Sequence, residues 1–331
     1  GSAAKQRKRT SGDTSPSAAL LAWVEGGAYF GWDWNGGQYR IFFRDSIGTS
    51  TTSGQPQELV LLLHGFPSAS FDWSGVWEKL LQRGLRVVCF DLLGFGFSDK
   101  PPNVQYLIRG LQADLAEAVV THCCGAAPVQ PRVHVLAHDY GDTVAQELLA
   151  RHNARAAGSM RLASVALLNG GLFPEQHRAK LVQTLLLHPY VGPTAVWLGF
   201  TSSRCLFERN FRSVFVVQPT VQEMDDYWHL LTLRGGHRIM HRLMQYIAER
   251  RACRARWVGA LLCTAVPLIF IDGVEDPISG AQMVDHYEKL VPNPTVARMA
   301  GVGHYPQTEA PAEMLRQYLA FLRKAGCDLG L

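Results

Sequence analysis

The sequence predicts an α/β protein, in which a largely parallel β-sheet has helices on both faces and carries a separate helical lobe. First, buried-strand patterns alternate with helical stretches along most of the chain, which is typical of such a sheet. Second, the connection from Gly170 to Leu261 runs for about ninety residues with helical periodicity and few strand signals, far longer than an ordinary loop. This connection predicts a helical cap inserted between two strands.

The strands are predicted from short runs of apolar residues. An antiparallel hairpin opens the sheet, because Asn35-Gly36-Gly37 is a turn signal inside the strand-like stretch "AYFGWDWNGGQYRIFFRDS". Continuous apolar runs, as in strands that are buried on both faces, follow in "ELVLLLHG", "LRVVCFDLLG", "RVHVLAHD", "LASVALLNG" and "VPLIFIDG". The stretch "VARM" adds a further strand before a glycine-rich loop.

These patterns divide the chain into a tail, a core and a cap. Residues 1–24 are predicted to be a disordered basic tail, because "KQRKR" lies in a polar stretch. Residues 25–170 and 261–331 form the sheet-containing core, and residues 171–260 form the helical cap. The cap is placed to cover the carboxyl ends of the strands, where open α/β sheets bind ligands. Most of its many aromatic residues are expected to be its own core.

Composition excludes several classes of function. The net charge is only +4, and no basic face or binding motif follows the tail, so we expect no nucleic-acid partner. The seven cysteines show no metal-ligand spacing and suit free thiols in a reducing compartment. No apolar run approaches the length of a membrane span. The apolar stretch from Val191 to Phe200 could touch a membrane, but we favour a buried cap helix there.

The stretch "LAHDYGD" is typical of a strand end, a sharp turn and a helix start. Small residues, Ala137 and Gly141, flank Asp139, as a tight strand-to-helix elbow requires because the helix packs close to the strand. The carboxylate of Asp139 would lie at a helix N-terminus, which favours an anion, and would be a usable nucleophile. Asp139 could instead be only a helix cap, but Asp142 is already well placed for that role.

Two later residues complete a catalytic triad. Asp276 follows the strand that ends at Gly273, and His304 lies in the glycine-rich loop after "VARM". The chain order of nucleophile, acid and histidine is that of hydrolases with a nucleophile elbow. His304 would be the general base, and Asp276 would fix its tautomer and orientation. Asp272 is a competing acid, but it lies at the strand end and not in the turn that follows.

Backbone groups beside the elbow predict an oxyanion hole. The stretch "HGFP" must turn sharply after its strand, so the N–H groups of Phe66 and Tyr140 could bind a developing negative charge. For the side chain of His64 we favour a structural role, in which it braces this turn by hydrogen bonds. The glycine-rich stretch from Asp91 to Pro101 fits no phosphate-binding loop and is interpreted as architecture near the cleft.

Together these motifs resemble the α/β-hydrolase superfamily, in its epoxide hydrolase and haloalkane dehalogenase branch. The resemblance rests on "HGFPSASFDW", "GFGFSDKP", "HDYGD" and "GHYPQ". Within that branch, "HDYGDTVAQELL", "NGGLFPE" and "QYIAERRACRARWVGAL" are most similar to the mesoderm-specific transcript family. The resemblance covers about residues 36–325 and implies an α/β-hydrolase fold, with an eight-stranded, mostly parallel sheet and an inserted cap.

The resemblance implies a two-step hydrolysis. Asp139 attacks a saturated carbon and forms an alkyl ester, and water activated by His304 and Asp276 then hydrolyses that ester. A carboxylate nucleophile suits epoxides and alkyl halides, whereas with a carboxylic ester it would have to form a high-energy anhydride. The expected partners are water and a small apolar or lipid-like substrate, and no metal or organic cofactor is implied.

Epoxide opening and dehalogenation need different protein groups to stabilise the leaving atom. An epoxide needs an acid, which cap tyrosines supply in that family, and Tyr246 is the best candidate by resemblance, ahead of Tyr190 and Tyr227. Each of them could instead be a packed helix tyrosine. A halide needs N–H donors, commonly a tryptophan directly after the nucleophile, where this chain has Tyr140. Phe66 also departs from the dehalogenase pattern, because its side chain has no N–H donor for a halide. An epoxide hydrolase-like activity is therefore preferred.

A non-catalytic role is the remaining alternative. A hydrolase fold can serve as a lipid-binding or partner-binding module, but such a module has no need of all three triad residues. The resemblance also suggests association with the endoplasmic reticulum membrane, while the cysteines suit a cytoplasmic location.

Overall fold

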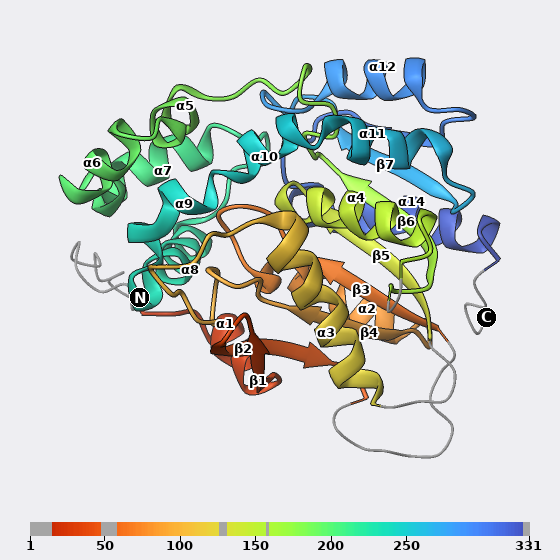
Figure 1. Cartoon of the computed structure of the whole chain (residues 1–331), viewed down its shortest axis with the longest axis horizontal. Coiled ribbons are helices and arrows are strands. Elements are labelled where there is room, and N and C mark those ends of the chain that lie inside the picture. Colours follow the sequence, from red (N-terminus) through yellow and green to blue (C-terminus); the bar gives the residue numbers. More distant parts are fainter. Residues whose placement is uncertain (1–14, 48–57, 126–130, 157–158, 327–331) are drawn as a thin grey trace, which may run out of the picture.

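The computed structural model describes residues 15–47, 58–125, 131–156 and 159–326, which form an eight-stranded sheet with helices on both faces (Figure 1). The strand order is β1-β2-β4-β3-β5-β6-β7-β8. Pairing is parallel from β4 to β8 and antiparallel at β1 and β2, which confirms the predicted sheet. The strands are β1 (Ala28–Trp34), β2 (Gly37–Asp45), β3 (Glu58–Leu63), β4 (Arg86–Phe90), β5 (Arg132–His138), β6 (Leu162–Leu168), β7 (Leu268–Gly273) and β8 (Val296–Met299).

The predicted hairpin opens the sheet. Trp34 of β1 pairs with Gly37 of β2, so the connecting turn consists of Asn35 and Gly36. Both turn residues have positive φ angles, 48° and 76°. Asparagine and glycine reach this left-handed region at low cost, and a two-residue turn of this kind matches the twist of the two strands.

Two hydrophobic cores lie on the two faces of the sheet. Along β3, Leu59, Leu61 and Leu63 belong to one core, while Val60 and Leu62 belong to the other. Because successive side chains of a strand point to opposite faces, a strand covered on both sides must be apolar throughout. The covering helices are α1 (Ala18–Glu25), α2 (Ser74–Leu81), η2 (Ile108–Gln112), α3 (Ala113–Cys124), α4 (Tyr140–Asn153), α11 (Arg254–Cys263), α12 (Ala281–Leu290), α13 (Pro306–Glu309) and α14 (Pro311–Lys324).

The N-terminal region differs from the predicted disordered tail of residues 1–24. Residues 18–25 form the helix α1, whose N-terminus is capped by the hydroxyl of Ser17. Leu20 and Trp23 of this helix are buried, and the ring of Trp23 packs edge-on against Trp77 at 5.4 Å. So short a helix forms because it buries an apolar face on the core, a tertiary effect that local sequence does not reveal. The basic run "KQRKR" lies outside the described residues.

The long connection between β6 and β7 forms the helical cap. It contains α5 (Leu181–Leu187), α6 (Val191–Trp197), η3 (Phe200–Ser202), α7 (Arg204–Arg212), α8 (Val221–Thr232), η4 (Leu233–Ile239), α9 (Met240–Leu243) and α10 (Tyr246–Ala252). The next helix, α11, packs along α4 in the layer that covers the sheet (Figure 1). The predicted cap boundary at residue 260 therefore falls inside a core helix. Within the described part of the chain, no helix combines the length and apolarity needed to cross a membrane.

Candidate active site

The turn between β5 and α4 is a strained elbow. Asp139 occupies it with φ 46° and ψ −100°, a conformation that residues other than glycine rarely adopt. At Gly141, an added Cβ atom would lie 2.5 Å from the carbonyl oxygen of Leu63, so only glycine allows the helix to start this close to β3. Asp139 is 4% exposed. The local structure is the predicted elbow, which lifts the carboxylate to the edge of the sheet.

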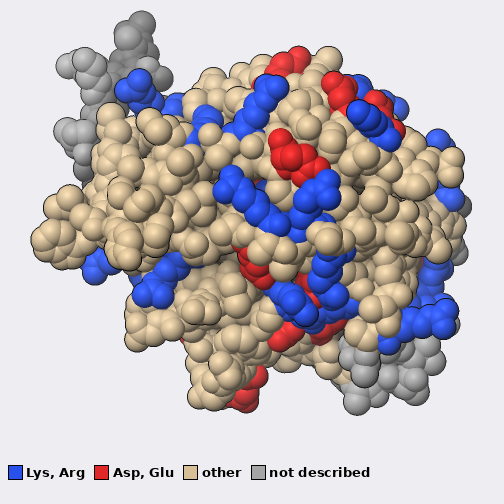
Figure 2. Space-filling model, turned by 45° about the horizontal axis from the view of Figure 1, so that its top comes forward, with Lys and Arg blue, Asp and Glu red and all other residues tan. Residues whose placement is uncertain are grey.

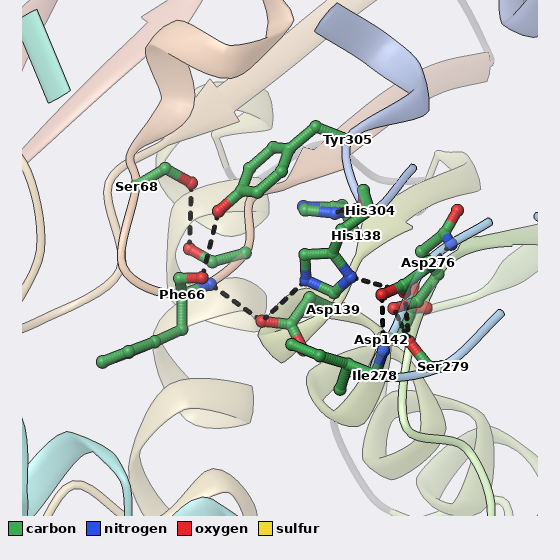
Figure 3. Close-up of polar contacts among 12 residues, drawn as sticks. Phe66, Ser68, His138, Asp139, Asp142, Asp276, Ile278, Ser279, His304 and Tyr305 are labelled. Atoms are coloured by element: carbon green, nitrogen blue, oxygen red, sulfur yellow. Dashed lines mark hydrogen bonds and ion pairs between the residues drawn. The ribbon is translucent and has the colours of Figure 1, made fainter. Parts of the chain in front are cut away.

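Three groups from separate parts of the chain face the carboxylate of Asp139. The N–H of Phe66 donates to its Oδ2 at 3.1 Å, and Nε2 of His304 lies 3.9 Å from the same oxygen (Figure 3). The hydroxyl of Tyr246, which begins cap helix α10, donates to Oδ1 at 3.5 Å. A backbone donor, an imidazole and a phenol thus surround one anion.

His304 is oriented by Asp276, as the sequence predicted. Its Nδ1 lies 2.7 Å from Oδ2 of Asp276 (Figure 3). The same carboxylate accepts hydrogen bonds from the N–H of Ile278 and the hydroxyl of Ser279, both at 2.8 Å, and from the amide of Asn169 at 3.1 Å. These bonds fix the carboxylate, and with it the direction in which the imidazole faces Asp139.

The competing acid, Asp272, takes no part in this arrangement. Its side chain is fully buried, and neither carboxylate oxygen has a hydrogen-bond partner among the described residues. Burial raises its pKa well above the ordinary value, so it is held as a neutral acid. An uncharged carboxyl without contact to His304 cannot orient that residue.

The charges of the triad stabilise one another. Burial alone would lower the pKa of His304, but the carboxylates of Asp276 and Asp139 outweigh it and raise that pKa to about 10. Burial alone would raise the pKa values of both carboxyl groups, but the hydrogen bond and charge of His304 hold them below their usual range. In the resting site the imidazolium therefore lies between two carboxylates.

The turn that was predicted to supply an oxyanion hole is braced by hydrogen bonds. Nδ1 of His64 lies 2.8 Å from the carbonyl oxygen of Gly65, and its Nε2 accepts from the N–H of Leu92 at 3.0 Å. The side chain of His64 therefore holds the turn, in line with the structural role favoured above. The Phe66 N–H already faces Asp139, while Tyr140 is the first residue of α4, so its N–H has no acceptor within the helix.

Only one of the three candidate cap tyrosines lies beside Asp139. Tyr246 is 1% exposed, with its ring 4.7 Å from that of Tyr140. Tyr190 is 79% exposed, which contradicts its candidacy as an acid beside the buried Asp139. Tyr227 packs against the ring of Phe211 at 4.7 Å, whereas the hydroxyl of Tyr246 reaches Asp139.

Sequence reasoning missed a buried arginine next to Tyr246. Arg250 is 2% exposed, and its Nε and Nη2 donate to the hydroxyl of Thr143 at 3.1 and 2.5 Å. Its guanidinium lies 4.9 Å from the centre of the Tyr246 ring, and Nη1 has no hydrogen-bond partner among the described residues. The spacing of four residues between Tyr246 and Arg250, on one face of a helix, is the signal that could have revealed it.

Sequence reasoning also missed Asn169, which follows β6. Its amide nitrogen donates to Asp276 and to the carbonyl oxygen of Gly273, both at 3.1 Å. It has a positive φ of 45°. The available signal was its position, because a polar residue directly after a buried parallel strand lies at the edge where such sheets place their sites.

An apolar cavity of about 110 Å³ opens between the cap and the triad. Asp139 and His304 lie on its core side with Phe66 and Tyr305. Most of the remaining wall is apolar, and Lys180 is the one Lys or Arg in it among the described residues. The cap side is lined by Val182, Gln183, Leu186, Phe200, Thr201, Ser203, Leu206, Phe207, Asn210, Phe211, Val214, Leu231, Met240 and Met244. The cavity therefore presents an apolar surface next to a buried carboxylate.

Comparison with known proteins identifies the family. The family model described as "Alpha/beta hydrolase family" matches residues 60–317. This chain belongs to the alpha/beta hydrolase family. It is 39% identical over 310 residues to the mesoderm-specific transcript protein of Mus musculus, covering 92% of this chain and 88% of that protein. The family resemblance deduced from the motifs is thereby confirmed.

Solved structures place this alpha/beta hydrolase among enzymes of the same fold. A haloalkane dehalogenase, the DbeA-M1 loop variant from Bradyrhizobium elkanii, superposes with a TM-score of 0.70 at 18% identity, covering 91% of this chain and 97% of that one. The epoxide hydrolase CorEH superposes with a TM-score of 0.67 at 20% identity, covering 90% and 99%. At such identities these similarities establish the fold, and the reaction has to be argued from the site.

Proposed function

We propose that this alpha/beta hydrolase opens the epoxide ring of an apolar or lipid-like substrate through an alkyl ester on Asp139. The observation that carries the proposal is the hydroxyl of Tyr246, 3.5 Å from Oδ1 of Asp139. A buried anionic nucleophile and a phenolic proton donor then face the same reacting centre beside an apolar cavity. Ring opening needs this combination, because the nucleophile attacks carbon while the ring oxygen becomes an alkoxide.

In the first step, a carboxylate oxygen of Asp139 bonds to a ring carbon, the carbon–oxygen bond of the ring breaks, and Tyr246 gives its proton to the ring oxygen. Burial, and next the charge of Asp139, raise the pKa of Tyr246, so the phenol stays protonated until an alkoxide develops. The guanidinium of Arg250, 4.9 Å from the ring, stabilises the phenolate that remains.

The second step uses the change in charge that the first step causes. Esterification neutralises Asp139, one of the two carboxylates that raise the pKa of His304 to about 10. The imidazolium can then return a proton to the Tyr246 phenolate and become a neutral base. It next takes a proton from water, and the hydroxide formed adds to the ester carbonyl. The oxyanion is held by the N–H groups of Phe66 and Tyr140. Its collapse breaks the ester bond, and the proton of the added hydroxyl passes to the leaving alkoxide, which gives the diol, restores the carboxylate of Asp139 and leaves His304 protonated again.

Dehalogenation is less well supported. No tryptophan lines the described part of the cavity, so no indole N–H is available there for a leaving halide. The residue after the nucleophile is Tyr140, whose side chain is fully buried and whose hydroxyl accepts from the amide of Gln112 at 3.5 Å. A non-catalytic binding role is disfavoured because it gives no reason to keep an imidazolium between two buried carboxylates.

Trapping the alkyl ester tests the proposal. The His304→Ala variant is incubated with separate pools of long-chain epoxides and long-chain alkyl bromides, and intact-protein mass spectrometry is followed by peptide mapping. Because this variant has no base for the second step, we expect an adduct on Asp139 with the full mass of the epoxide. The matched control, His304→Ala with Asp139→Asn, should form none. An adduct from the bromide pool alone would replace epoxide opening with dehalogenation, and no adduct from either pool would contradict a nucleophilic Asp139.

We also propose association with the endoplasmic reticulum membrane, which rests on the resemblance to the mesoderm-specific transcript family alone.

A further inference from the structure

One segment of the cap is unusual in both charge and exposure. From Leu181 to Ser203 the chain contains no Asp, Glu, Lys or Arg, although these make up 18% of the whole sequence. The segment forms α5, α6 and η3. Scattered apolar residues on a surface are ordinary, but several on one segment mark an interaction site. Its most exposed large side chains are Leu181 (85%), Trp197 (83%), Tyr190 (79%) and Leu198 (70%).

This exposure corrects the expectation that residues 191–200 form a buried cap helix. Trp197 and Leu198 turn most of their surface to solvent, and Val191 is 39% exposed. These side chains are only partly covered by the described residues. Burying them would stabilise the fold by about 25 cal/mol for each Å² of apolar surface removed from water. A surface that keeps such residues exposed is shaped for contact with something outside the chain.

The opposite side of the same segment forms the wall of the cavity. Val182 and Leu186 of α5 and Phe200 of η3 line the space above Asp139. The segment therefore combines an outer apolar surface with side chains of α5 and η3 that line the cavity. A molecule that moves between the two meets almost no charged side chain on this part of the cap.

The charged residues next to the segment are mainly basic. Arg178 precedes it and Arg209 follows it on α7, and both are exposed. Figure 2 shows the lobe at the left, which the cap helices form, as a mostly uncharged surface with blue side chains along its lower edge. A bilayer with anionic lipids has the complementary pattern, because its apolar interior lies beneath negative headgroups. Tryptophan and tyrosine favour the boundary between these two layers.

We propose that α5, α6 and η3 form a docking surface for an anionic lipid bilayer, into which Leu181, Tyr190, Trp197 and Leu198 insert. A bilayer fits better than a protein partner because these side chains are 70–85% exposed, so they protrude from the helices and do not line a groove. Such insertion places the cap in the interface without crossing the membrane. Binding of this kind does not depend on the reaction proposed for Asp139.

Vesicle flotation of the full chain tests the docking surface. The probe is vesicles of phosphatidylcholine with about 30% phosphatidylserine, a composition that gives a negative surface. We expect the wild type to float with them and the double variant Trp197→Glu with Leu198→Glu to lose binding by at least about tenfold, because each charge must enter an apolar layer. The matched control is Val221→Glu, which adds a charge at another apolar position that is 69% exposed. It should bind as the wild type does.

A second measurement reports the inserted residue directly. The protein has eight tryptophans, so the Trp197→Phe variant isolates the contribution of one of them. Lipids brominated on their acyl chains should quench the fluorescence of bound wild type more than that of bound Trp197→Phe. The proposal is overturned if the wild type does not bind the vesicles, if the double variant floats as well as the wild type, or if quenching is equal in both proteins. Loss of self-association in the double variant, without any vesicle binding by the wild type, would assign the surface to a protein partner instead.

Discussion

The two sides of the active-site cavity are built on opposite principles. On the core side, Asp276 accepts hydrogen bonds from Ile278, Ser279, Asn169 and His304, so nearly every charge is paired. On the cap side, α5 and α6 carry no charge and leave large apolar side chains exposed. Directed hydrogen bonds therefore hold the polar groups around Asp139 in place, whereas the outer helices of the cap offer an apolar surface without directed bonds. Variants around Asp139, including those of Tyr246 and Arg250 on cap helix α10, should change the reaction in any medium. Variants on the outer surface of α5 and α6 should act only where a membrane is present.

The largest effect is expected for the nucleophile. Asp139→Asn keeps the size of the side chain but removes the attacking anion, so turnover in a fresh preparation should fall by at least about 10³-fold. Slow deamidation can restore aspartate, which makes a rise in activity during storage part of the expected result. Steady-state assay of a long-chain epoxide, with the residue mass checked by mass spectrometry, provides the measurement. Undiminished activity in protein that still holds asparagine would refute the assignment.

The next effect concerns the proton donor. Tyr246→Phe keeps the ring but removes the hydroxyl near Asp139, so epoxide turnover should fall by about 100-fold. The matched control is Tyr227→Phe, since that tyrosine is buried elsewhere in the cap, against the ring of Phe211. Pre-steady-state measurement of ester formation should place the loss in the first step. Equal losses in the two variants would show that Tyr246 acts only through packing.

Arg250 should have a smaller, pH-dependent effect. As a positioning residue it stabilises the phenolate of Tyr246 through the aromatic ring, so Arg250→Leu should lower kcat by about tenfold and leave KM within about twofold. Its removal should also shift the alkaline limb of the pH–rate profile, because the phenol becomes a weaker acid. Arg250→Lys keeps the charge and should recover part of the rate. A uniform loss at every pH, without rescue by lysine, would indicate a structural role alone.

Much of the site could be predicted from the sequence because its residues lie in turns that directly follow recognisable strands. Asp139, Asp276 and His304 each follow a strand, and parallel strands end at a common edge. Arg250 and Asn169 were missed because their roles depend on which elements meet across the fold. The position of Tyr246 beside Asp139, and of Tyr190 at the surface, likewise depends on the packing of the cap. Exposure of α5 and α6 was not foreseen because an apolar helix looks the same in sequence whether it faces a core or a membrane.

The proton held by His304 should also change how the stability of the fold depends on pH. The pKa of His304 is raised from 6.5 to about 10, so the folded protein holds a proton that the unfolded chain releases. The stability that this proton contributes is complete below about pH 6.5 and is lost as the pH rises towards 10. The Tm of the wild type should therefore fall more steeply over this range than that of His304→Gln. Lys100, whose pKa burial lowers to about 8, titrates in both proteins and cancels in the difference. Parallel curves would show that the two carboxylates do not hold the proton.

The smallest effect separates the two sides of the cavity most sharply. The double variant Trp197→Glu with Leu198→Glu changes side chains that are 83% and 70% exposed and do not line the cavity. With a short, water-soluble epoxide its kcat should stay within about twofold of the wild type, because no group near the reacting atoms has changed. With a long-chain epoxide held in anionic vesicles, its rate should fall in proportion to its loss of binding. A deficit of the same size with both substrates would mean that the cap surface supports the catalytic geometry, and the division between a chemical core and a docking cap would not hold.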